Sequence, residues 1–347
     1  MLPNGRRLGA HLPLAAGMVR AADRAAAIGA SAMQVFVDNP TSWRRRPTLP
    51  PELPAFRRRL ADHDIAPLSV HAPYIVNLAG PDEESWERSV ALMANELRVA
   101  AAYGAAFLNL HTGSHRGSGI DVGTARLAEG LRRVLEAAGD EGGDVVLLLE
   151  NGAGGGFGLG STPEELGAID RAAAALGVPR ERIGFCLDTA HVWVAGFPVG
   201  TAEGVDALLA EIDAQVGLDR LRLVHLNDSR SEVGSGSDHH EHLGSGRIGH
   251  DGLARFLVHP GLCNVAYIIE TPGMEEGWDA VNMTRARDLA AGRPLESLPA
   301  KAFHTRSARG RGAPPEAEGL GAEPDADDRK AEPVAGEPEA GEAAAAT

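Results

Sequence analysis

The feature that most constrains this sequence is a series of histidines and acidic residues at nearly regular intervals, each at the end of a short apolar run. These residues are His11, Asp38, His71, His111, Glu150, Asp188, His225 and Glu270. From His71 onward they stand 37 to 45 residues apart, which suits one strand, one helix and their loops. An ionisable side chain is costly to bury without a partner, so six consecutive strands that end in this way indicate a shared site.

Apolar runs and amphipathic, alanine-rich segments alternate along the chain. The expected strands are 7–11, 32–37, 68–71, 107–111, 145–150, 183–188, 221–226 and 265–270. The expected helices between them include 19–28, 83–103, 124–138, 163–176, 204–216 and 251–257. Strands that alternate with helices pair in parallel through right-handed crossovers, and eight such units predict an α/β fold, the (β/α)8 TIM barrel. An open, doubly wound sheet is the alternative.

The composition changes near residue 295. Few large apolar side chains follow, and the segment is basic from His304 to Arg311 and acidic from Glu316 onward. Such a segment buries too little surface to offset its chain entropy. We therefore expect a barrel domain of residues 1–295 and a disordered, low-complexity tail of residues 296–347, basic and then acidic.

The start of the chain resembles a targeting segment only superficially. Arg6 and Arg7 precede an apolar stretch, but His11 and Pro13 interrupt it. No apolar run reaches the roughly 18 to 20 residues that span a bilayer. We expect a cytoplasmic protein that does not contact a membrane.

The charge and the cysteine content limit the possible functions. Lys and Arg number 33 against 48 Asp and Glu, which gives a formal net charge of −15. This balance argues against broad electrostatic coating of DNA, although it leaves room for a local site. Cys186 and Cys263 are too few for a disulfide scaffold or a thiolate zinc finger. Any metal must therefore be held by histidines and carboxylates.

Nine such side chains are expected to converge, because active sites of TIM barrels form at the carboxyl ends of the strands. Two loops after strands add to the strand ends, one with His191 and one with the His-rich tract 238–242. The nine candidates are His71, His111, Glu150, Asp188, His191, His225, Asp238, His240 and Glu270. Five imidazoles and four carboxylates suit Zn²⁺, and Mn²⁺ or Fe²⁺ accept them too. Three ions that share a bridging carboxylate would use all nine.

Two further segments give weaker indications of a binding function. The glycine-rich stretch 152–160 follows a strand, but it matches neither G-x-G-x-x-G nor the phosphate-binding loop, so we expect a flexible loop and no nucleotide cofactor. Residues 43–47 form the one basic run beside an aromatic residue, after the second strand. Both a phosphate contact and a solvated loop fit that run.

Taken in order, these residues resemble the endonuclease IV family of abasic-site endonucleases. The resemblance extends from about Leu8 to Leu289 and is carried by the motifs at 109–115, 149–154, 188–191, 225–230, 238–246, 248–250 and 269–271. It implies a zinc-dependent endodeoxyribonuclease of base excision repair, monomeric, with three Zn²⁺ ions. Its substrate would be double-stranded DNA with abasic sites, and a metal-activated hydroxide would cleave the phosphodiester 5′ to the lesion to leave a 3′-hydroxyl.

The resemblance also implies a role for each candidate ligand. Glu150 would bridge two ions and be the central catalytic ligand. His71 and His111 would hold one of these ions, and Asp188, His225 and Glu270 the other. The third ion would be held by His191, Asp238 and His240.

The expected DNA contacts include positions at which the sequence departs from the family. Tyr74 and Ile75 occupy the positions of side chains that wedge into DNA. Arg44, Arg230 and His239 are the other expected contacts. Asp38 and Thr41 stand where the family has Lys and Arg, His239 stands for an Arg, and Thr112 stands for a Pro. Arg44 to Arg46 are expected to compensate for the lost charge.

Two other functions account for part of this pattern. A metal-dependent TIM-barrel sugar isomerase or epimerase uses the same kind of ligand, but it needs about four of them, which would leave His191, Asp238 and His240 without a role. A non-enzymatic binder of damaged DNA has no use for an intact ligand set.

Overall fold

Eight parallel strands close into a barrel in the computed structural model, which describes residues 1–304 except for the side chain of Glu275. The barrel strands are β1 (Leu8–His11), β2 (Ala32–Val35), β3 (Leu68–His71), β4 (Phe107–His111), β5 (Val146–Glu150), β6 (Ile183–Asp188), β7 (Leu221–His225) and β10 (Ala266–Ile269). Strand β10 pairs with β1 and closes the ring. The predicted TIM barrel is confirmed, and the doubly wound alternative is wrong because the sheet has no free edge.

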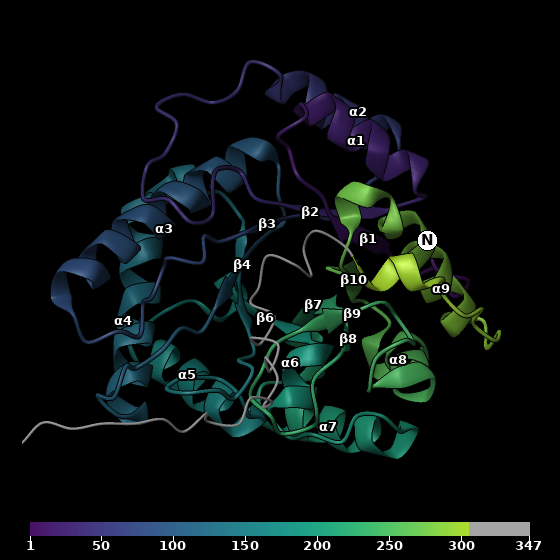
Figure 1. The fold of residues 1–347 in the computed structure, drawn as a ribbon. Helices are drawn as coiled ribbons and strands as arrows, with labels where there is room; N and C mark the ends of the chain where they lie inside the picture. Colours follow the sequence, from purple (N-terminus) through teal and green to yellow (C-terminus); the bar gives the residue numbers. More distant parts are fainter. Residues whose placement is uncertain (305–347) are drawn as a thin grey trace, which may run out of the picture. The chain divides into compact units, whose positions relative to one another are not determined.

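Helices surround the barrel (Figure 1). They are α1 (Met18–Ala27), α2 (Leu53–Asp62), α3 (Glu83–Tyr103), α4 (Ile120–Ala138), α5 (Pro163–Ala175), α6 (Thr189–Val194), α7 (Ala202–Gln215), α8 (Gly249–Val258) and α9 (Trp278–Ala290). Short 3₁₀ turns are η1 (Gly139–Gly142), η2 (Arg180–Arg182), η3 (Leu218–Arg220), η4 (Pro260–Leu262), η5 (Met274–Glu276) and η6 (Ala300–Phe303). Strands β8 (Asp228–Ser229) and β9 (His240–Glu241) form a small antiparallel ribbon outside the barrel.

Three helices are not among the helical segments named from the sequence, although a helical turn was expected where α6 begins. Prolines surround the start of α2, and Pro54 lies in its first turn, where a missing N–H is tolerated. Helix α6 is only six residues long. The buried face of α9 carries polar side chains, among them Asp279, Asn282 and Arg285, so its sequence lacks a clear apolar stripe.

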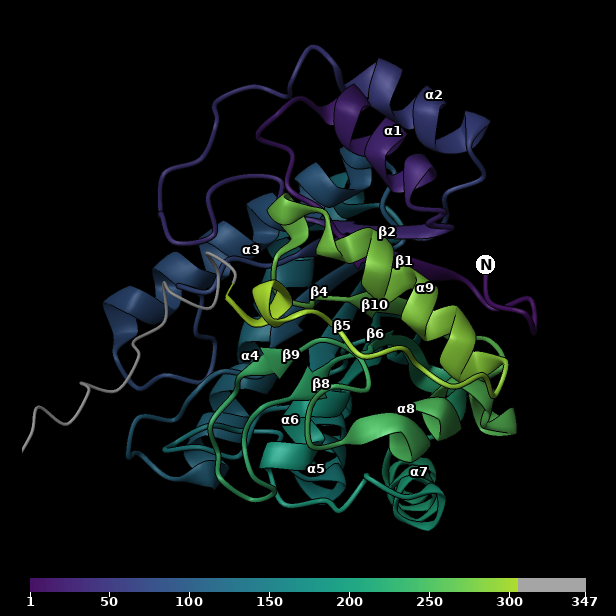
Figure 2. The same ribbon diagram turned by 45° about the vertical axis from the view of Figure 1, so that its right-hand side comes forward.

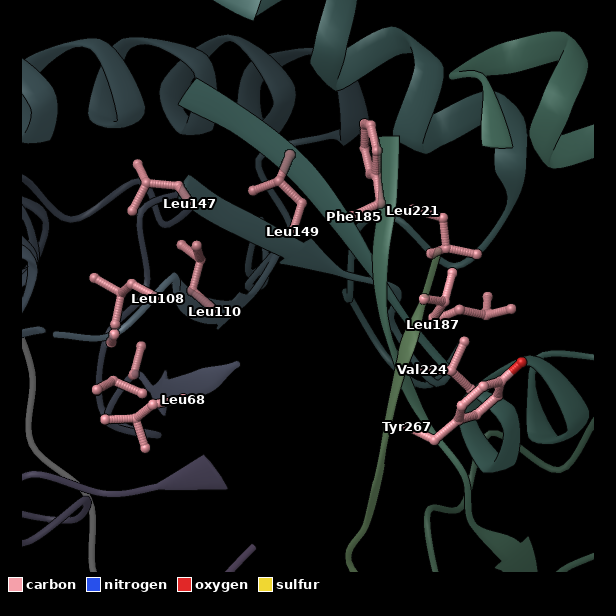
Figure 3. Packing of buried hydrophobic residues seen from close by; sticks show 14 of the residues in the cluster. Leu68, Leu108, Leu110, Leu147, Leu149, Phe185, Leu187, Leu221, Val224 and Tyr267 are labelled. Atoms are coloured by element: carbon pink, nitrogen blue, oxygen red, sulfur yellow. The ribbon is translucent and has the colours of Figure 1, made fainter. Parts of the chain in front are cut away.

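Alternate residues of each strand face opposite sides of the barrel wall. Figure 3 shows outward-facing side chains, including Leu147, Leu149 and Phe185, in the cluster that packs between the barrel and the helices. The smaller inward-facing cluster consists of Ala32, Leu148, Cys186, Leu223, Ala266 and Ile268. Because the period is two residues, the next inward positions after Leu148 and Cys186 are Glu150 and Asp188. The alternation therefore brings ionisable groups into one mouth of the barrel.

The packed part of the chain extends beyond residue 295, where the sequence suggested that the barrel domain ends. After α9 the chain runs back toward β9 (Figure 2) and forms turn η6, the last described element, where Ala302 is buried. One buried alanine hardly changes the composition of a segment, so the sequence analysis placed the end of the domain too early, at residue 295. The rest of the predicted tail, residues 305–347, lies outside the described residues.

Within residues 1–304, no helix combines the length and the apolar character that a membrane span requires.

The loop between β2 and α2 is fixed to α3 by a buried ion pair. Arg45 Nε lies 2.7 Å from Glu96 Oε1, and the Glu96 side chain is only 2% exposed. On the same loop, the ring of Trp43 lies beneath the guanidinium of Arg88. Asp38, expected at a strand end, lies three residues past β2, and its carboxylate accepts a hydrogen bond from the Arg46 N–H. This residue therefore shapes the loop and does not join the ring of strand ends.

The Arg45–Glu96 pair predicts a specific pH dependence of stability. Burial raises the pKa of Glu96 to about 7, although Arg45 opposes this effect. Between the ordinary value of 4.5 and about 7, the native state keeps a proton that the unfolded chain has released. The free energy of unfolding therefore falls as pH rises through this window, by up to about 3 kcal/mol.

Glu96→Gln removes this titration. Urea unfolding of both proteins at pH 5 and pH 8 should show that the wild type loses more stability than the variant as pH rises. Equal losses in the two proteins would contradict the assignment to Glu96.

Candidate metal centre

The carboxyl ends of the barrel strands bring together all nine residues singled out in the sequence. Five close a strand directly, Glu270 follows β10, His191 lies in α6, and Asp238 and His240 come from the loop before β9 and from β9 itself. Their side-chain nitrogen and oxygen atoms form three neighbouring groups. Each group contains ligand atoms that approach one another closely enough to hold a metal ion.

The first group contains His71, His111 and Glu150. Glu150 Oε2 lies 3.4 Å from His71 Nε2 and 3.9 Å from His111 Nε2. Glu150 is buried, whereas the side chain of His111 is 40% exposed. His111 therefore forms the side of this group that a substrate can reach.

The second group surrounds His225 with three carboxylates. Its Nδ1 lies 3.3 Å from Glu150 Oε1, 3.4 Å from Glu270 Oε2 and 3.8 Å from Asp188 Oδ2. Glu150 thus faces the first group with one oxygen and the second group with the other. This geometry would allow Glu150 to be shared between the two groups.

The third group lies beside Asp188. Asp238 Oδ2 is 3.3 Å from His191 Nε2, and Asp238 Oδ1 is 3.2 Å from His240 Nε2. His240 Nε2 also lies 3.6 Å from Asp188 Oδ2, which links the third group to the second.

Backbone carbonyls fix the orientation of three of the imidazoles. Nδ1 of His71 donates to the Ala72 carbonyl at 2.8 Å, that of His191 to the Asn151 carbonyl at 2.9 Å, and that of His240 to the Glu270 carbonyl at 3.0 Å. A carbonyl oxygen only accepts, so Nδ1 carries the hydrogen in each ring. In each ring Nε2 is thus the nitrogen that faces the centre, and it can act as an acceptor for a metal ion once it gives up its proton.

The buried side-chain amide of Gln34 fixes the orientation of the His225 ring. Gln34 donates from Nε2 to Glu270 Oε1 at 2.8 Å, so its Oε1 faces His225 Nε2 at 3.1 Å. His225 Nε2 therefore donates to Gln34, and Nδ1 remains as the acceptor among the three carboxylates.

This arrangement fits metal cations. Imidazole lone pairs that face carboxylate oxygens repel them unless a proton or a metal cation lies between. Asp238 Oδ1 and His240 Nε2 are buried and have no hydrogen-bond partner among residues 1–304. Burial alone would lower the pKa of His240, but the Asp238 and Asp188 carboxylates raise it to about 9. The same negative field favours a divalent ion, and the nitrogen and oxygen donors suit zinc.

Several supporting residues were missed by the sequence analysis. Asn109 Nδ2 donates to Glu150 Oε2 at 2.6 Å, and Asn227 Nδ2 donates to Asp188 Oδ2 at 2.8 Å. His11, which the sequence placed among the strand ends, has a supporting role too, because its Nδ1 donates to Glu270 Oε1 at 3.0 Å. Gln34 and Asn109 precede the strand ends, so attention to the last residue of each strand overlooked them. The two-residue alternation would have found Asn109, which shares the inward face with His111.

The loop with Asp238 and His240 is tied down by Asp228. This buried carboxylate accepts backbone N–H groups from Ser229, Gly246 and Ile248 at 2.8 to 3.0 Å. Burial raises the pKa of Asp228 despite these bonds. Its role is therefore to shape the chain rather than to bind an ion.

The glycine-rich loop 152–160 lies against a second glycine-rich segment. A Cβ atom at Gly155 would stand 2.6 Å from the Gly236 carbonyl oxygen, and one at Gly154 would stand 3.0 Å from Ala195 Cα. The glycines thus permit close approach of backbones, consistent with the absence of a phosphate-binding motif.

The residues expected to wedge into DNA lie beside the first group. The Tyr74 side chain is 59% exposed, and its ring centroid lies 6.0 Å from that of His111. Tyr74, the half-buried Ile75 and His111 all line a groove of about 630 Å³. This placement is suitable for contact with a substrate held at the first group.

The expected basic contacts differ in their surroundings. The Arg44 side chain is exposed and forms no ion pair with another described residue, whereas its neighbour Arg45 is held by Glu96. Arg230 Nε lies 3.9 Å from Glu241, and His239 Nδ1 is 3.1 Å from the hydroxyls of Ser231 and Ser237. Of the three arginines expected to compensate for the lost loop charges, Arg45 and Arg46 lie beside carboxylates, those of Glu96 and Asp38.

Comparison with known proteins identifies close similarity over most of the chain. A family model described as a xylose isomerase-like TIM barrel matches residues 22–293. The probable endonuclease 4 of Methanoculleus marisnigri is 42% identical over 283 residues, which cover 82% of this chain and 98% of that protein. The corresponding protein of Halorhodospira halophila is 40% identical, with 78% and 90% covered.

Solved structures agree with this similarity. The crystal structure of endonuclease IV from Thermus thermophilus matches with a TM-score of 0.71 and 38% identity, over 82% of this chain and 99% of that one. A D-tagatose 3-epimerase-like protein matches with a TM-score of 0.61, over 82% of this chain and 97% of its own. Its identity is only 17%, so that likeness shows a shared fold alone.

Replacement of Glu150 should remove more than one bound ion. Its two oxygens face different groups, so Glu150→Ala should reduce the metal content per folded chain by about two ions, as expected for a shared ligand. Elemental analysis after gel filtration measures this, with Glu232→Ala, an exposed carboxylate, as the control. An unchanged metal content would show that Glu150 does not bridge two sites.

Proposed function

Because the chain belongs to the endonuclease IV family, within the xylose isomerase-like TIM barrels, we propose that it is a zinc-dependent endonuclease of DNA repair. It cleaves double-stranded DNA on the 5′ side of an abasic site and leaves a 3′-hydroxyl. All the donors come from one chain, so the proposed active unit is a monomer.

The observation that carries this proposal is the donor set itself. Nine imidazole and carboxylate groups from one chain form three adjoining groups, with Glu150 between two of them. Three ions are therefore proposed, one for each group. Zinc ions held in this way lower the pKa of bound water toward neutrality and neutralise charge on a phosphate. No protein nucleophile is needed.

The chain's own residues hold these groups in place. Asn109 orients Glu150, Gln34 orients both His225 and Glu270, and backbone carbonyls orient the remaining buried imidazoles. Preorientation of this kind avoids rearrangement during the reaction. The exposed edge of His111 and the groove beside Tyr74 leave a path for one phosphate and its sugar.

Substrate selection follows from the depth of the site. A phosphate reaches the buried groups only if its nucleotide leaves the helical stack, and an abasic nucleotide has no base to unstack. Tyr74 and Ile75, on the rim of the groove, are proposed to fill the space left in the duplex. Arg44, Arg230 and His239 are proposed to contact the flanking phosphates.

A sugar epimerase is the second candidate, because the epimerase-like protein shares the fold. That chemistry uses about four ligands around one ion. The third group, with His191, Asp238 and His240, has no part in it, and the identity to the endonucleases is more than twice as high.

A nicking assay tests the proposal. The zinc-loaded protein is incubated with a duplex that carries one tetrahydrofuran abasic analogue. We expect a nick 5′ to the lesion, a 3′-hydroxyl that a polymerase extends, and loss of activity with a chelator. No nick at full metal content, together with epimerisation of a ketose, would favour the second candidate.

Arg44 should contribute to DNA affinity through charge. Arg44→Ala should weaken binding to the lesion duplex and reduce the slope of log K against log salt by roughly one. Arg222→Ala is the matched control, because this exposed arginine lies near the amino end of β7, away from the site. Equal salt slopes for Arg44→Ala and the wild type would exclude a phosphate contact.

A further inference from the structure

The chain continues past the residues that the family model matches, and this continuation contacts a loop that carries proposed metal ligands. The family model ends at residue 293. Residues 295–304, named here the C-terminal clasp, follow α9 and end beside β9 (Figure 2). Their contacts centre on the segment that directly follows His240.

His242 is the main point of contact. It is fully buried, and Asn282 of α9 donates from Nδ2 to His242 Nδ1 at 2.8 Å. His242 Nε2 therefore carries a hydrogen and donates it to the Ala302 carbonyl of the clasp at 2.9 Å. The rings of Trp278 and Phe303 lie 5.5 and 5.8 Å away. Both polar atoms of this buried ring are thus satisfied only while the clasp is docked.

Arg285 makes a second connection. Its guanidinium donates to the Leu243 carbonyl, to the Ser245 hydroxyl and, at 2.7 Å, to the Glu296 carbonyl of the clasp. The Leu295 side chain packs directly against Gly244. One arginine therefore joins the clasp to the same loop.

We propose that the C-terminal clasp positions the loop that carries Asp238 and His240, and so completes the third metal group. This inference rests on the proposed metal centre. Asp228 holds the loop through Ser229 and Gly246, and the clasp holds the stretch between them through His242. His240 is two residues from His242 along the chain that leaves β9, so a shift of one moves the other.

The clasp contributes little to the barrel core. Ala302 is its one buried residue and belongs to neither apolar cluster, and the half-buried Leu295 is the one clasp residue that packs against the main cluster. Loss of the clasp should therefore leave the barrel folded but change the position of the loop that carries Asp238 and His240. Groups that orient metal ligands typically change metal affinity by about tenfold to a hundredfold when they are removed.

Ala302→Arg in the full chain tests this, since no space exists for the larger side chain at this buried position. Ala300→Arg is the matched control, because Ala300 is exposed in the same turn. Zinc is titrated against a competing chelator, and the thermal unfolding of the metal-free proteins is measured. We expect one ion to bind about tenfold to a hundredfold more weakly in Ala302→Arg only. Ala302→Gly, which keeps the carbonyl, should bind zinc like the wild type.

Equal zinc affinities in Ala302→Arg and Ala300→Arg would overturn the inference. If Ala302→Arg does not fold, Phe303→Ala is titrated with zinc in the same way. Weaker binding of one ion only would support the positioning role of the clasp, and an unchanged zinc affinity would overturn it. Failure of the wild type to nick abasic DNA, with one ion still selectively weakened, would reject the proposed function but not the clasp.

Discussion

Four carboxylates, two of them fully buried, face the ring nitrogens of histidines at the centre of this structure. Such an arrangement is unfavourable by itself, because lone pairs and negative charges face one another in a region with little water. It becomes favourable when divalent cations lie between them. The barrel wall, the buried amides and the anchored loops can all be understood as the framework that keeps these groups together.

That framework acts through hydrogen bonds that orient most of the candidate ligands. Carbonyls fix the donor nitrogen of three imidazoles, and Gln34 fixes a fourth while it also holds Glu270. Asp228 and His242 hold the loop that supplies the third group. Groups on the barrel strands need less support than those on loops, because the sheet already restrains their backbone.

The charges of the molecule favour the binding of one phosphate at the proposed centre over a general attraction of DNA. The net charge of −15 opposes DNA at a distance, and Arg45 is turned inward toward Glu96. Arg44 is exposed and directly follows Trp43, which lines the groove beside Tyr74. The divalent ions of the proposed centre would then supply most of the attraction for one phosphate, over the short range that salt leaves unscreened.

The barrel and the nine candidate ligands could be predicted from the sequence, because periodic apolar runs and the residues that end them are local features of the chain. The other parts of the site depend on which segments the fold brings together. Gln34 and Asn109 are ordinary strand residues until the barrel closes around Glu150 and Glu270. Helix α9 and the clasp bury polar groups, so their packing has no apolar pattern that a sequence could reveal. Contacts between distant segments, such as His242 with Ala302, depend on three-dimensional proximity, which local periodicity does not encode.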